Sequence, residues 1–233
     1  MPISVGINEN VMLAKVAIGE KGALELYLDE AKEKANIFDS LNTAKVENTG
    51  TEVRLLVFPV KKPEGVRAEG KTDDELLDTV NEDLLKLRNQ LTQILEQYLT
   101  SDKISWDIYA GTGVDGANYR TMFLNDEALR KISENYFTQF VDMVRPFVGN
   151  PAYKLRWKLI RQSKDKHFAT LPGKYLVDSP MVELMDVPAE ASKVKFTKWE
   201  IDNGLNDGTP VAKPKKDGEE PAEGENAFTF GQR

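Results

Sequence analysis

The sequence predicts an α+β fold in which antiparallel strands from both ends of a globular region are separated by two inserted helices. Residues 11–60 and 153–201 contain strand-like alternation, whereas residues 72–147 contain two stretches of helical periodicity. The last segment, Asp202–Arg233, holds five Gly and three Pro without a hydrophobic pattern. This composition predicts a disordered tail after the folded region.

Composition restricts the function classes. The chain of 233 residues has no cysteine, which excludes disulfides, thiol catalysis and cysteine-based zinc sites. Its one histidine, His167, excludes a pair of catalytic histidines. We therefore expect a protein that is not an enzyme and that binds no cofactor or metal. A nuclease whose metal is held by scattered carboxylates is the remaining enzymatic alternative. No apolar run approaches the roughly 20 residues of a membrane span, so we expect a cytosolic protein without a membrane partner.

The N-terminal elements are predicted as strands. Val11–Ile18 and Ala23–Leu28 are separated by a short turn containing Gly22, which is typical of a β-hairpin. Every other residue of the second run is a leucine, as expected for a strand with one buried face. Glu52–Val60 is a third strand candidate.

Two helices are predicted next. Thr72 and Glu75 form a capping box, and apolar residues then repeat every three or four positions. This seam consists of Leu77, Val80, Leu84, Leu87, Leu91, Ile94 and Tyr98. It is consistent either with a helix packed on its own domain or with an intermolecular coiled coil. A second helix is expected from Asn125 to Arg145, ended by Pro146.

The motif between the helices, Gly111–Gly116, matches the pattern GxGxxG. The residues that follow are a poor opening for the helix that would hold a pyrophosphate, so a flexible glycine-rich loop is the favoured interpretation.

The segment Tyr153–Tyr175 carries seven Lys or Arg residues against one acid, a charge of +6. The whole chain has a net charge of −7, so the rest of it sums to −13. Within this segment Lys154, Arg156 and Lys158 alternate with apolar residues, which predicts a strand with a row of cations on one face. This face is interpreted either as a binding surface for a polyanion or as the solvated outside of an edge strand.

Further strand-like runs are Met181–Met185 and Lys193–Ile201. Trp157 is assigned to the core because it shares a strand face with leucines.

Aromatic residues accompany the positive charge of this region. Phosphate neutralisation combined with base stacking suits single-stranded nucleic acid. The candidate contacts are Lys154, Arg156, Lys158, Arg161, Lys164, Lys166, Phe168, Lys174, Tyr175, Lys195, Lys198 and Trp199.

Four stretches, GINENVMLAKV, YKLRWKLIRQSKDKHFATLPGKY, VELM and KVKFTKWEI, together with the acidic tail, resemble single-stranded DNA-binding proteins of tailed bacteriophages. The resemblance implies an oligonucleotide-binding (OB) five-stranded antiparallel barrel built from about residues 5–60 and 150–201, with a helical insertion at 72–147. It also implies sequence-tolerant, non-enzymatic binding that protects single strands during DNA replication or recombination in the host cytoplasm. The Cys/His zinc cluster of the best-known phage member is missing here.

In such proteins the acidic tail docks replication or recombination partners. The corresponding residues here are Glu219, Glu220, Glu223, Glu225, Phe228 and Phe230. Phe228 and Phe230 are followed by Gly231-Gln232-Arg233, so this tail ends on a cation, unlike the tail pattern of the bacterial proteins. An alternative from a different class is an assembly protein, such as a virion component, that forms a homo-oligomer through the seam of Leu77–Tyr98.

Overall fold

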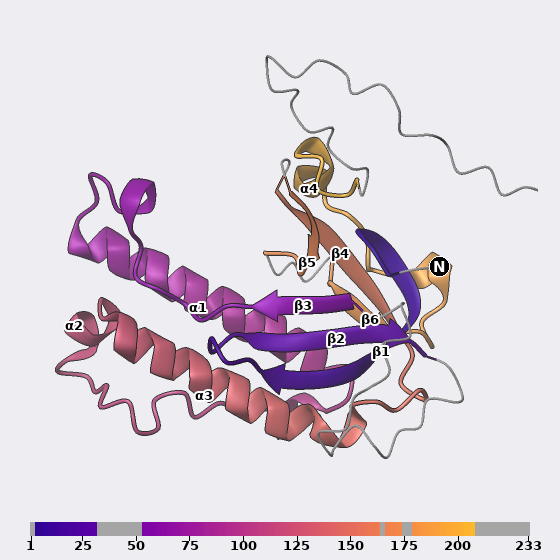
Figure 1. Ribbon diagram of the computed structural model, residues 1–233, viewed down its shortest axis with the longest axis horizontal. Coiled ribbons are helices and arrows are strands. Elements are labelled where there is room, and N and C mark those ends of the chain that lie inside the picture. Colours follow the sequence, from indigo (N-terminus) through magenta and orange to yellow (C-terminus); the bar gives the residue numbers. More distant parts are fainter. Residues whose placement is uncertain (1–2, 32–52, 164–165, 174–178, 208–233) are drawn as a thin grey trace, which may run out of the picture.

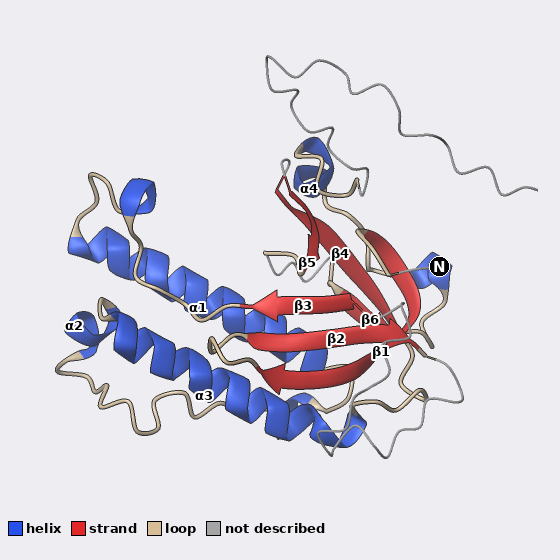
Figure 2. Cartoon of the chain, viewed as in Figure 1, coloured by secondary structure: helices blue, strands red, loops and turns tan. Residues whose placement is uncertain are grey.

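In the computed structural model, strands and helices share one hydrophobic core, and a pair of long helices projects from the sheet (Figures 1 and 2). The structure describes residues 3–31, 53–163, 166–173 and 179–207. In chain order the main elements are β1 (Gly6–Ile18), β2 (Leu24–Glu30), β3 (Val53–Val57), α1 (Asp73–Leu95), α2 (Tyr119–Phe123), α3 (Asp126–Val144), β4 (Leu155–Ser163), β5 (Lys166–Thr170), β6 (Val182–Leu184) and α4 (Lys198–Asp202).

The strands form a nearly closed antiparallel barrel. Hydrogen-bonded pairing runs in the order β3-β2-β1-β4-β5, and β3 and β5 at the two ends of this order contact each other. The short β6 pairs with β4 beside β5. The helices α1, α2 and α3 are inserted between β3 and β4, so the expected α+β barrel with a helical insertion is confirmed.

A local irregularity lets β1 serve two neighbours. Its second half pairs with β2, while its first half pairs with β4. Between the two halves the register shifts from Asn8 to Val11, and Asn10 adopts a positive φ of 57°. Asparagine tolerates this left-handed conformation better than most residues, and bulges of this kind increase bend and twist. The bend allows β1 to pair with β2 and with β4, which closes the sheet toward a barrel.

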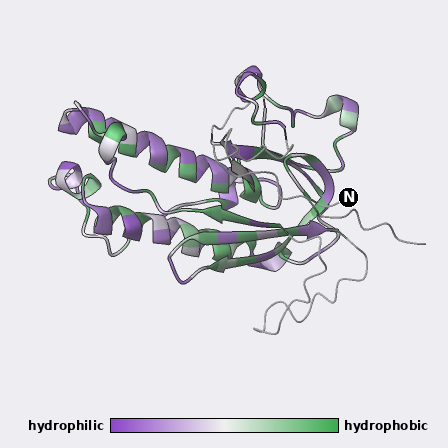
Figure 3. Cartoon of the chain, turned by 45° about the horizontal axis from the view of Figure 1, so that its top comes forward, coloured by the Kyte–Doolittle hydropathy of each residue, from purple (hydrophilic) through white to green (hydrophobic). Residues whose placement is uncertain are grey.

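Strand alternation places one set of side chains inside the barrel. Leu24, Leu26 and Leu28 of β2 are fully buried, and so are Leu155, Trp157 and Leu159 of β4. Figure 3 shows hydrophobic residues recurring along these strands and along the helices beside them. Trp157 belongs to the core, as the sequence predicted.

Both predicted helices are confirmed. The Thr72 side chain accepts the backbone N–H of Glu75, and the Glu75 carboxylate accepts the N–H of Thr72, so the capping box is complete. Five of the seven seam residues of α1 are buried in the common core: Val80, Leu84, Leu87, Leu91 and Ile94. The seam therefore packs within the domain. No helix in the described part of the chain is long and apolar enough to cross a membrane.

The expectation of a strand at Lys193–Ile201 is wrong. The chain is irregular from Ser192 to Thr197 and then forms the short helix α4. The reason is a second capping box, in which Thr197 and Glu200 exchange the same two hydrogen bonds as Thr72 and Glu75. This pattern starts a helix, and it overrides the alternation of apolar and charged residues.

Replacing Leu91 by alanine tests the packing of α1. Leu91 is fully buried, so we expect Leu91→Ala to lower the free energy of unfolding by about 2–5 kcal/mol in urea titrations. Leu85 lies on the same helix but is 53% exposed, and Leu85→Ala is the matched control, with a change within about 0.5 kcal/mol. The unfolding midpoint is expected to be independent of protein concentration. A midpoint that rises with concentration would instead indicate a seam between chains.

Candidate nucleic-acid interface

Three of the basic residues that the sequence predicted as nucleic-acid contacts are buried. Arg156, Lys158 and Arg161 of β4 expose only 3%, 1% and 6% of their surface. The expected outward row of cations is therefore wrong at Arg156 and Lys158, whereas Lys154 at its start is exposed. The strand itself and its alternation are confirmed, but its second face is covered.

The cover is the C-terminal part of the described chain. The Lys158 ammonium donates hydrogen bonds to Ser179 Oγ at 3.1 Å, to the Lys195 carbonyl at 3.0 Å and to Glu200 Oε2 at 3.1 Å. Burial lowers the pKa of Lys158, and the nearby Glu200 carboxylate opposes this shift. Because Glu200 also caps α4, the buried ammonium fixes that helix to the barrel.

Arg156 forms a second buried network. Its Nε donates to Glu9 Oε1 at 2.9 Å, and its Nη1 donates to Glu183. Burial acts to lower the pKa of Arg156, but the hydrogen bonds and charges of Glu183 and Glu9 outweigh it and raise the pKa. The guanidinium thus joins β1, β4 and β6, and its charge is used inside the protein.

The other predicted contacts have different positions. Lys195, Lys198 and Trp199 are exposed, and Trp199 shows 54% of its surface. Lys166 and Phe168 lie in β5, but their side chains are outside the description. The remaining predicted residues lie outside the described ranges: Lys164, Lys174, Tyr175, Glu219, Glu220, Glu223, Glu225, Phe228 and Phe230.

A different cationic and aromatic surface lies on the outer face of β1, β2 and β3. Tyr27 of β2 is the register partner of Lys15 on one side and of Arg54 on the other. The neighbouring leucines of β2 and β3 point inward, so these three side chains share the outer face. The Lys15 ammonium lies 5.0 Å from the centre of the Tyr27 ring. We name Lys15, Tyr27 and Arg54 the outer row.

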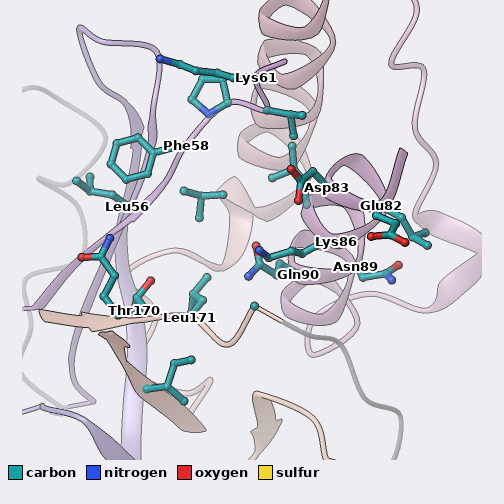
Figure 4. A pocket seen from close by; sticks show the side chains of 18 of the residues that line it. Leu56, Phe58, Lys61, Glu82, Asp83, Lys86, Asn89, Gln90, Thr170 and Leu171 are labelled. Atoms are coloured by element: carbon teal, nitrogen blue, oxygen red, sulfur yellow. The ribbon is translucent and has the colours of Figure 1, made fainter. Parts of the chain in front are cut away.

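The outer face continues into a large cleft. Leu56 and Phe58 follow Arg54 at two-residue spacing, and Phe58 is 62% exposed. Both line a cleft of about 1270 Å³ between the end of β3, the helix α1 and the β4–β5 part of the barrel. Figure 4 shows Leu56 and Phe58 on one side of this cleft and Lys86 and Gln90 of α1 on the other.

The lining of the cleft combines cations and aromatic surface with four acids, Glu64, Glu82, Asp83 and Glu200. Lys61, Lys62 and Lys86 line it and form no salt bridge with any described residue. Arg67 also lines it but is paired with Asp83 at 2.7 Å. Trp199 of α4 contributes a second exposed ring besides Phe58. These are the groups that neutralise phosphates and stack on bases.

Sequence reasoning missed the outer row and most of the cleft. One usable signal was the stretch RLLVF at 54–58, in which Arg54, Leu56 and Phe58 share a face opposite Leu55 and Val57. A phenylalanine at an outward position departs from the polar outer face that is expected of an antiparallel strand with one solvated side. The dense charge of the β4 segment concealed this weaker pattern.

Comparison with known proteins gives no further guide, since no family model, curated protein or solved structure matches the chain. Among the described residues, no group of three or more His, Asp or Glu side chains is arranged to hold a metal ion.

Removing the buried ammonium tests whether the β4 cations are structural. Lys158→Met leaves the Glu200 carboxylate buried without its cationic partner, so we expect a loss of about 3–5 kcal/mol in the free energy of unfolding. Lys154→Met, four positions earlier and exposed, is the control and is expected to change it by about 0.5 kcal/mol or less. Equal stabilities of the two variants, measured by chemical denaturation, would contradict the structural role.

Proposed function

We propose that this protein binds single-stranded DNA without sequence preference and without catalysis, on the outer row and in the adjoining cleft. The observation that carries the proposal is the register of Lys15, Tyr27 and Arg54, which sets an aromatic ring between two cations on an outer barrel face. Resemblance to phage single-stranded DNA-binding proteins supports the same function and suggests DNA replication or recombination as its setting.

The arrangement of the barrel supports the same proposal. The ring order β1-β2-β3-β5-β4, with helices between β3 and β4, is compatible with an OB barrel. In OB barrels the face of the second and third strands binds oligonucleotides. Here that face carries Tyr27, Arg54, Leu56 and Phe58, which are part of the surface that we propose for DNA.

Single strands fit this surface better than a duplex does. Stacking on Phe58 and Trp199, which are 62% and 54% exposed, requires a free base face. In a duplex each base face is already stacked on its neighbours, and only the groove edges and the phosphates are accessible. The lysines of the cleft are suited to the phosphates of a flexible strand that bends between the barrel and α1.

Fluorescence anisotropy with a labelled mixed-sequence single strand and the matching duplex tests the proposal. We expect tight single-strand binding, weaker duplex binding, and a log affinity that falls linearly with log salt by about 0.7 for each phosphate neutralised. Absence of single-strand binding at low salt would contradict the proposal.

Two substitutions locate the site. Tyr27→Ala and Phe58→Ala each remove a stacking ring, so we expect each to weaken single-strand binding about 5- to 150-fold, corresponding to roughly 1–3 kcal/mol per base. Tyr109→Ala is the control, because Tyr109 is 45% exposed but does not line the cleft. Equal losses in all three variants would place the binding surface elsewhere.

A further inference from the structure

A carboxylate lies within the cationic outer face. Glu25 belongs to β2, two residues before Tyr27, and its Oε1 is 3.6 Å from Arg54 Nη1. Its Oε2 accepts a hydrogen bond of 2.5 Å from the Tyr27 hydroxyl. One acid thus contacts two of the three members of the outer row.

The position of this carboxylate is restricted by its surroundings. The Glu25 side chain is only 18% exposed, whereas the Arg54 side chain is 55% exposed. The turn after β1 also lies close to the carboxylate, since a Cβ added at Gly19 would lie 2.7 Å from Glu25 Oε1. The carboxylate is therefore held beside the guanidinium, while the guanidinium remains accessible from solvent.

A carboxylate and a phosphate compete for the same donors. Both accept hydrogen bonds from a guanidinium and are attracted by its positive charge. An Arg54 that is paired with Glu25 therefore binds an incoming phosphate less strongly. The Glu25 charge also repels a phosphate that approaches this part of the face. The same carboxylate orients Tyr27 through its hydroxyl, and burial together with this carboxylate raises the pKa of Tyr27.

We propose that Glu25 is an affinity-determining residue that competes with phosphate for Arg54 and thereby keeps binding of a single strand reversible. This inference rests on the proposed function of the outer row. It assigns to an acid inside the binding surface the role of limiting affinity, whereas the basic and aromatic residues around it supply affinity.

The variant Glu25→Gln tests this inference. The amide has nearly the same shape and still accepts the hydrogen bond of Tyr27, but it no longer pairs with Arg54. We expect single-strand binding to become about 3- to 10-fold tighter at low salt. The released guanidinium neutralises one further phosphate, so the slope of log affinity against log salt should become steeper by about 0.7.

A matched control separates local competition from net charge. Glu20→Gln changes the total charge by the same amount at an exposed position in the turn between β1 and β2. It is expected to leave affinity nearly unchanged. If Glu25→Gln and Glu20→Gln alter affinity equally, the gain is a general charge effect and the inference fails.

A double-mutant cycle with Arg54→Gln completes the test. The gain from Glu25→Gln should disappear when Arg54 is already replaced, because no guanidinium is then left to release. An undiminished gain in that background would overturn the inference while leaving single-strand binding intact. Absence of binding by the unmodified protein would instead overturn the proposed function, and this inference with it.

Discussion

The structure depends on strand alternation around one core. In each barrel strand every second side chain must be inside, and fully buried leucines on β2 and β4 show which set this is. A slip of one residue would turn a whole inner face to solvent, so the apolar pattern also fixes the register between strands. The register in turn places Lys15, Tyr27 and Arg54 opposite one another. The outer row is therefore a consequence of the same leucines that stabilise the barrel.

The outer face of β4 is covered by other parts of the chain, whereas the outer face of β1–β3 is accessible to solvent. On β4 the outward cations Arg156 and Lys158 are covered by the chain segment that ends in α4, and both have hydrogen-bonded partners that offset their desolvation. On β1–β3 the outward groups stay accessible and meet the cleft at Phe58. Lys158 links the two regions, because it fixes α4 to the barrel. Trp199, which lines the cleft, belongs to this helix. The buried cations thus support the binding surface indirectly.

Local signals predicted the elements well. The hairpin, both long helices, the strand character of β4 and the core position of Trp157 follow from periodicity and capping, which are properties of neighbouring residues. Burial of Arg156 and Lys158 does not follow from such signals, because it depends on which distant segment lies over β4. The cleft is hidden for the same reason: Phe58, Lys86 and Trp199 are far apart in sequence and meet only through the fold.

The most direct test of this account is ultraviolet cross-linking of the protein to a single-stranded oligonucleotide, with the attached residues identified by mass spectrometry. The account predicts cross-links at Tyr27, Phe58 and Trp199, which belong to the outer face and the cleft. It predicts none at Tyr109, which is exposed outside the cleft. Cross-links confined to Tyr109 and its neighbours, or no cross-link at saturating oligonucleotide, would contradict it.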